Sequence, residues 1–185
     1  MVMMTMTTKS PQSENRVLVI MAGGAGERFW PVSNRATPKQ LLRLHGDKTL
    51  LQASFDRAAQ IVPPERIYIA AGERLREAVL REIPAFHPGN YIAEPFARNT
   101  AACLGLAACR IEKYHGPGIV MGILTADHVI DESPAFFAAV EAALNHAAAS
   151  DDLVAIGMKP THAETGYGYL ELRPGSMHTR GLGTS

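Results

Sequence analysis

The chain of 185 residues has few cysteines, no excess of either charge and no long apolar run. Its 18 Lys and Arg residues balance its 18 Asp and Glu residues, which argues against nucleic acid or an anionic membrane as a partner. No apolar stretch reaches the length that spans a bilayer. Cys103 and Cys109, the two cysteines, fall on different faces of one predicted helix and cannot form a disulfide there. This indicates a reducing compartment, the cytoplasm.

Residues 17–39, VLVIMAGGAGERFWPVSNRATPK, are the most informative part of the sequence. The apolar run Val17–Met21 predicts a buried strand, and the glycines after it predict a loop that lets an anion approach the backbone N–H groups. The glycines alone fit an ordinary turn equally well. Arg28 and Lys39 favour a phosphate site, because both would bring positive charge to it. The candidate nucleotide-binding residues of this loop are Ala22, Gly23, Gly24 and Gly26.

Two common glycine loops are excluded. The chain lacks the Gly-Lys-Ser/Thr ending of a Walker A loop, and Phe29 stands where the dinucleotide fingerprint needs its third glycine. The string AGGAGERFWPVSNRATPKQLL instead resembles the sugar nucleotidyltransferase family, with its GGxGxR…PK signature, and most of all its mannose-1-phosphate guanylyltransferases (GDP-mannose pyrophosphorylases). The resemblance implies GTP and mannose 1-phosphate as substrates, GDP-mannose and pyrophosphate as products, and Mg²⁺ as cofactor.

A second motif, EPFARNTA at residues 94–101, follows a predicted short strand. Its plain interpretation is a capped helix start, with Asn99 or Thr100 as the cap. The resemblance favours a nucleotide contact instead, because the family's EPxxRNTA string forms the loop that faces the base. It implies base and ribose contacts from Glu94, Arg98, Asn99 and Thr100. The Glu94 carboxylate could accept hydrogen bonds from the N–H edge of guanine.

A third motif, TADH at residues 125–128, ends another predicted buried strand. Mg²⁺ commonly takes one or two carboxylates together with phosphate oxygens, which suits Asp127. The alternative is a turn or capping aspartate, and His128 could equally serve the fold. The family's metal-binding aspartate stands in a similar LxxDH motif, so the resemblance makes Asp127 the metal ligand. Arg28, Lys39 and Asp127 are the expected catalytic residues.

The segment ETGYGYL, residues 164–170, is the last candidate. By itself it predicts a hairpin or a bulged strand with small residues. In the resembling family the corresponding segment lies against the sugar phosphate. The resemblance therefore assigns the sugar phosphate to Gly166, Tyr167 and Gly168.

Strands and helices alternate along the chain. This predicts an α/β, Rossmann-like fold with a mostly parallel sheet and helices on both faces. Strands are expected at residues 17–21, 66–71, 90–93, 118–124, 153–157 and 167–172. Helices are expected at residues 50–62, 73–83, 100–114 and 134–149, the last with Ser133 as N-cap. In such sheets ligands bind beyond the carboxyl ends of the strands, which is where the three motifs at residues 22–39, 94–101 and 125–128 fall.

The expected organisation has three parts. Residues 1–15 form a disordered leader, residues 16–172 the N-terminal part of a nucleotidyltransferase domain, and residues 173–185 an irregular tail. The resemblance stops near Leu172, before the family's EKP motif and second metal-binding aspartate, so the chain looks truncated. It could be an active enzyme, a catalytically inactive nucleotide-binding module or a fragment that does not fold. The oligomeric state, a homo-oligomer included, is open.

Overall fold

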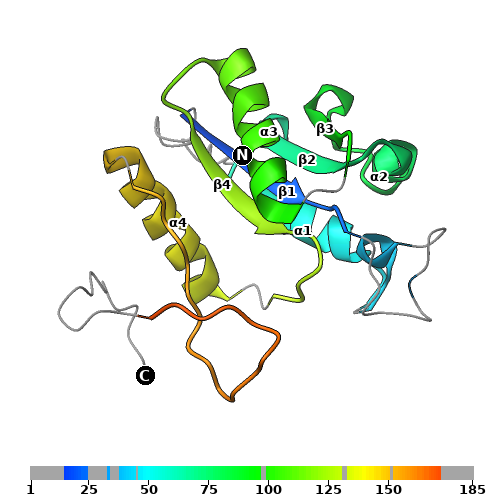
Figure 1. Ribbon diagram of the computed structural model, residues 1–185. Coiled ribbons are helices and arrows are strands. Elements are labelled where there is room, and N and C mark those ends of the chain that lie inside the picture. Colours follow the sequence, from blue (N-terminus) through cyan, green and yellow to red (C-terminus); the bar gives the residue numbers. More distant parts are fainter. Residues whose placement is uncertain are drawn as a thin grey trace, which may run out of the picture. The chain divides into compact units, whose positions relative to one another are not determined.

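The computed structural model describes residues 15–24, 33, 38–44, 46–96, 99–130, 133–150 and 152–171 (Figure 1). The chain forms two compact units, Met1–Ile130 and Asp131–Ser185. In these described ranges, no helix combines the length and the apolar character needed to cross a bilayer.

The first unit is built on a four-stranded sheet in which every strand pairs in parallel with its neighbour. The strands, in the spatial order β3-β2-β1-β4, are β1 (Arg16–Met21), β2 (Ile67–Gly72), β3 (Tyr91–Glu94) and β4 (Val120–Thr125). The central strand β1 places Val19 beside Tyr68 of β2 and beside Ile123 of β4. This confirms the predicted parallel sheet and the α/β fold class.

Helices cover both faces of this sheet, as predicted. Because side chains alternate along a strand, Leu18 and Ile20 of β1 point to one face, and Val17 and Val19 point to the other. The first pair is fully buried against α1 (Leu50–Ala59) and α2 (Arg76–Glu82). The second pair is fully buried against α3 (Asn99–His115), which supplies Cys103, Ala107 and Ile111. Burial of each such aliphatic side chain stabilises the fold by about 1.5–3 kcal/mol.

Short 3₁₀ turns complete the first unit: η3 (Lys39–Leu41), η4 (Pro64–Arg66), η5 (Glu73–Leu75) and η6 (Pro88–Asn90). The predicted helix at residues 73–83 therefore begins as the η5 turn and becomes α-helical only at Arg76.

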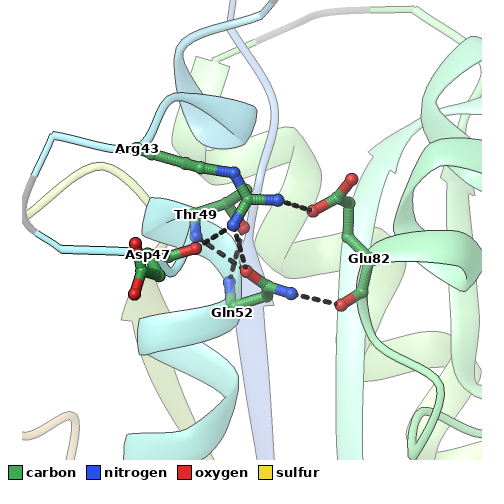
Figure 2. A network of polar contacts seen from close by, with 5 residues as sticks. All are labelled: Arg43, Asp47, Thr49, Gln52 and Glu82. Carbon is green, nitrogen blue, oxygen red and sulfur yellow. Dashed lines mark hydrogen bonds and ion pairs between the residues drawn. The ribbon is translucent and has the colours of Figure 1, made fainter.

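A polar network joins the start of α1 to the end of α2 (Figure 2). Thr49 and Gln52 form a capping box: the Thr49 hydroxyl accepts from the Gln52 N–H at 3.1 Å, and Gln52 Oε1 accepts from the Thr49 N–H at 2.8 Å. Gln52 Nε2 also donates to the Glu82 carbonyl at 2.6 Å. The Arg43 guanidinium donates to the Glu82 carboxylate at 3.1 Å and to the Asp47 carbonyl. The network fixes the segment before α1 against both helices.

The second unit holds one helix within its described residues, α4 (Pro134–Ala149). The predicted cap is confirmed, since the Ser133 hydroxyl accepts from the Phe136 N–H at 3.4 Å. The two strands predicted here were wrong: residues 153–157 and 167–171 are irregular, and Leu153 is fully exposed. A strand needs a neighbouring strand for its backbone hydrogen bonds, and an apolar run does not by itself supply one.

Candidate nucleotide-binding cleft

The sheet changes its direction of growth between β1 and β4. Strands β1, β2 and β3 follow one another outward, and the chain then returns through α3 and adds β4 on the other side of β1. Such a switch point leaves a crevice outside the carboxyl ends of the strands, where α/β proteins bind ligands. A cleft of about 380 Å³ lies there. It is lined by Met21, Gly23, Gly24, Gln40, Glu94, Asn99, Thr100, Cys103, Thr125 and Asp127.

Lys39 and Asp127 form an ion pair at this cleft, although they are 88 positions apart in the sequence. Lys39 belongs to the η3 turn and Asp127 follows β4; their side chains are only 17% and 29% exposed. Burial alone would raise the pKa of the Asp127 carboxyl. The hydrogen bond and charge of Lys39, with the nearby His128, outweigh burial and hold this pKa below its ordinary value. Asp127 is therefore an anion at neutral pH.

A side chain at Gly23 and one at Gly24 would meet different obstacles. Gly24 has φ +100°, in the left-handed region that side chains disfavour. At Gly23 an added Cβ would come within 2.7 Å of Oε2 of Glu94, so the flexible Glu94 side chain would have to move. On the other side of the loop, Gln40 Nε2 donates to the Gly23 carbonyl at 2.8 Å. The start of the loop is thus held between β3 and the η3 turn.

The first turn of α3 forms another wall of the cleft. Asn99 has φ +59°, a conformation that asparagine tolerates better than most residues and that often occurs at functional sites. Helix N-termini carry unpaired N–H groups and partial positive charge, which suits a bound anion. One turn further on, burial raises the pKa of the Cys103 thiol to about 12, helped by the charge of Glu94 and a hydrogen bond with it. Cys103 therefore stays a thiol at neutral pH.

The structure brings many of the predicted site residues together. Gly23, Gly24, Glu94, Asn99, Thr100 and Asp127 line one cleft, and Lys39 joins them through its ion pair. Ala22 is buried, does not line the cleft, and uses its N–H to donate to the Ala70 carbonyl at 2.8 Å. The functional roles assigned to all these residues stay predictions.

Other predicted site residues lie elsewhere. Gly26, Arg28 and Arg98 fall outside the described residues. Gly166, Tyr167 and Gly168 belong to the second unit, where the Tyr167 side chain is 69% exposed. Their segment is a small loop rather than a hairpin, and the Tyr169 hydroxyl closes it by donating to the Glu164 carbonyl at 2.9 Å.

Sequence reasoning missed Gln40 and Cys103. Gln40 is 1% exposed, and its Oε1 has no hydrogen-bond partner among the described residues, an unusual state for a buried amide. The available signal was its place directly after Lys39 in the TPKQLL run. Cys103 could have been found from its spacing, because it stands four residues after Asn99 and so on the same helix face.

The cleft has the donors that Mg²⁺ uses. Within the part of the chain that the structure describes, no group of three His, Cys, Asp or Glu side chains could hold a metal by itself. Asp127 and Glu94 nevertheless present carboxylates to the same cleft. Mg²⁺ needs only one or two carboxylates when phosphates and water supply its other ligands. These residues therefore fit the ion in the presence of a nucleotide.

The nucleotidyl transferase family model matches residues 17–180. The chain belongs to the nucleotidyl transferase family. It is 43% identical over 156 residues to the mannose-1-phosphate guanylyltransferase RfbM of Salmonella typhimurium, and 41% identical over 156 residues to a mannose-1-phosphate guanylyltransferase of Escherichia coli. Both alignments cover 82% of this chain and 32% of the relative. The chain thus spans about a third of the length of these relatives.

Solved structures agree with this fold. The fold matches a mannose-1-phosphate geranyltransferase from Thermus thermophilus with a TM-score of 0.62 and 36% identity, over 72% of this chain and 38% of that one. A mannose-6-phosphate isomerase from Helicobacter pylori, 22% identical, shares the fold with a TM-score of 0.54, over 71% of this chain and 46% of that one. The predicted resemblance to mannose-1-phosphate guanylyltransferases, and with it the resemblance to enzymes, is confirmed.

Proposed function

We propose that this chain carries the nucleotide site of an enzyme that makes GDP-mannose and pyrophosphate from GTP and mannose 1-phosphate. The observation that carries the proposal is the Lys39–Asp127 pair beside a glycine loop, at the switch point of the sheet. One cation and one carboxylate at such a crevice suit a triphosphate and its metal. The choice of GTP and mannose rests on the names of the relatives.

In the proposed reaction an oxygen of mannose 1-phosphate attacks the α-phosphorus of GTP in line. The bond from that phosphorus to the bridging oxygen of the β-phosphate breaks, and pyrophosphate leaves. Gly23–Gly26 and Arg28 would hold the triphosphate, Lys39 would neutralise charge on the reacting phosphates, and Asp127 would hold Mg²⁺. The ion, when bound, would spread negative charge away from the phosphates. No protein nucleophile is needed, because positioning and charge neutralisation suffice.

We assign base and ribose contacts to the wall formed by β3 and α3. The Glu94 carboxylate is a hydrogen-bond acceptor suited to the N1–H and N2–H₂ groups of guanine. Its position in the cleft, close against Gly23, supports this role. Arg98, Asn99 and Thr100 would contact the base or ribose. Gly166, Tyr167 and Gly168 would contact the sugar phosphate, whose hydroxyls can meet backbone groups.

Pyrophosphate release tests the proposal. The chain is incubated with Mg²⁺, one of GTP, UTP, dTTP or ATP, and a panel of sugar 1-phosphates. We expect release with GTP and mannose 1-phosphate above every other pair. A preference for UTP or dTTP would overturn the assignment of the base.

A second candidate is a catalytically inactive nucleotide-binding module. It would use the same cleft and glycine loop to bind GTP, without the transfer step. Calorimetry with GTP and Mg²⁺ separates the candidates: binding without turnover supports the module, and turnover eliminates it. A folded chain that does not bind GTP contradicts both.

The compartment and partners follow from the same proposal. Both cysteines are free in the structure, one buried and one exposed, which suits the reducing cytoplasm. The partners are the two substrates rather than nucleic acid or a membrane. Light scattering would measure whether the chain forms a homo-oligomer.

A further inference from the structure

Lys39 and Asp127 have separate tasks in the proposed reaction, yet they bond to each other. Lys39 Nζ donates to Oδ2 of Asp127, and Nε2 of His128 lies 3.8 Å from the other carboxylate oxygen. Both oxygens of the proposed metal ligand therefore face a basic group of the protein. The one further acidic side chain that lines the cleft within the described residues is Glu94.

We propose that Lys39 competes with the divalent cation for Asp127, and that nucleotide phosphates relieve this competition by drawing the lysine away. The inference rests on the proposed function, which assigns Asp127 to the metal. It predicts that the protein without nucleotide binds the ion weakly, and that metal and nucleotide strengthen each other's binding.

The competition follows from charge and space. The lysine ammonium takes up an oxygen that the metal would use, and it places a positive charge where a second cation must enter. The pair is largely shielded from water, so salt and solvent weaken this repulsion less than they would at the surface.

The geometry lets the lysine leave without unfolding its segment. The backbone around Lys39 is held, because the Leu42 N–H donates to the Lys39 carbonyl at 3.1 Å and the Leu41 N–H donates to the Pro38 carbonyl at 2.9 Å. The side chain is a flexible four-carbon stem that carries a point charge. A triphosphate offers this charge a stronger partner than one carboxylate. Since such coupling is reciprocal, the nucleotide would favour the metal as much as the metal favours the nucleotide.

Titration with Mn²⁺, followed by electron paramagnetic resonance, tests this inference without relying on activity. In the absence of nucleotide, Lys39→Met should bind Mn²⁺ about tenfold more tightly than the unmodified protein, because the competing charge is gone. With GDP present, this advantage should disappear, since the phosphates already occupy Lys39. The matched control is Lys48→Met, because Lys48 pairs with Asp56 at 2.7 Å and does not line the cleft. Its Mn²⁺ affinity should be unchanged.

Two outcomes are decisive. Equal Mn²⁺ affinity of the unmodified protein and Lys39→Met overturns the competition and leaves the proposed function standing. Adding Asp127→Asn to Lys39→Met should abolish the tighter binding; if tight binding survives, the metal lies elsewhere and the function assigned to Asp127 fails. Urea unfolding confirms that each variant is folded, and Lys39→Gln replaces the Met variant if that variant does not fold.

Discussion

Two polar clusters follow each other along the chain and differ in how fully their groups are paired. In the first, Gln40 lines the 380 Å³ cleft and its Oε1 has no partner among the described residues, while the neighbouring Lys39 pairs with Asp127 of the cleft. In the second, Arg43, Gln52 and Glu82 bond to one another and to the backbone (Figure 2). The second cluster also borders a hollow, but one of only about 190 Å³.

This difference distinguishes a candidate ligand site, at Gln40, from a structural network, around Gln52. A buried polar group without a partner costs stability, so it persists where a ligand or water completes it. A network whose members are all paired instead rigidifies the fold. Gln40 and Gln52 have the same side chain, but among the described residues Gln40 leaves its Oε1 unpaired, whereas Gln52 uses both Oε1 and Nε2.

Thiol labelling should show the largest contrast at the cleft. Cys103 is buried and its pKa is raised to about 12, whereas Cys109 is exposed. Because the thiolate is the reactive form, N-ethylmaleimide at about pH 8 should modify Cys109 at least about a hundredfold faster than Cys103. Peptide mass spectrometry over time measures both rates, and GTP should slow only Cys103. Similar rates at the two cysteines would show that the wall of the cleft opens readily.

Glycine substitution should show the next largest contrast. Gly23→Ala forces the Glu94 carboxylate to move, so we expect GTP affinity to fall by about tenfold or more. Gly24→Ala meets no neighbour but strains a backbone at φ +100°, and should cost about 1–2 kcal/mol of stability. Calorimetry and urea unfolding of both variants separate the two effects. Unchanged GTP affinity in Gly23→Ala would mean that the position of Glu94 does not matter for binding.

Gly23 and Gly24 show which features of the site could be predicted from the sequence and which could not. That this loop follows a buried strand could be predicted, because the β-branched run and the glycines are adjacent in the chain. That a side chain at Gly23 would meet the Glu94 carboxylate could not be predicted, because Gly23 follows β1 and Glu94 ends β3, and the two meet only in the folded sheet. The Lys39–Asp127 pair was hidden for the same reason, although both residues were chosen as candidates from their local motifs.

The helices and central strands could be predicted because their periodicity is local. The predicted strands at residues 153–157 and 167–172 were wrong over their described residues, because strand formation depends on a partner, which no local pattern contains. Gln40 was missed because its unpaired oxygen is a property of its surroundings rather than of its position in the sequence.

The two glutamines test the comparison directly. Gln52→Ala removes half of a capping box and the bond to the Glu82 carbonyl, and should lower the free energy of unfolding by about 1–2 kcal/mol. Gln40→Met loses the bond to the Gly23 carbonyl but also removes an unpaired buried oxygen, so its cost should stay below about 1 kcal/mol. Urea unfolding gives both values, and calorimetry should show weaker GTP binding for Gln40→Met alone. A larger loss of stability in Gln40→Met, or weaker GTP binding in Gln52→Ala, would refute the distinction between a ligand site at Gln40 and a structural network around Gln52.

The smallest effect should come from another paired cluster, around His115 at the end of α3. Its Nδ1 lies 3.2 Å from an Arg66 guanidinium nitrogen, and its Nε2 lies 2.7 Å from the Tyr68 hydroxyl. A guanidinium can only donate, so Nδ1 accepts and the ring is neutral with its proton on Nε2. Burial, and then the charge of Arg66, lower the pKa of His115 below its ordinary value.

The sign of the pH dependence follows from this lowered pKa. In the unfolded chain His115 has an ordinary pKa near 6.5, so below that pH it takes up a proton that it resists in the folded state. The free energy of unfolding therefore keeps its full value above about pH 6.5 and falls as the pH drops below it. The free energy of unfolding should therefore decrease from about pH 7 to about pH 5 more steeply in the unmodified protein than in His115→Gln, which has no titrating ring. GTP affinity should be the same in both, because His115 does not line the cleft. Parallel stability profiles would mean that His115 binds its proton equally well folded and unfolded.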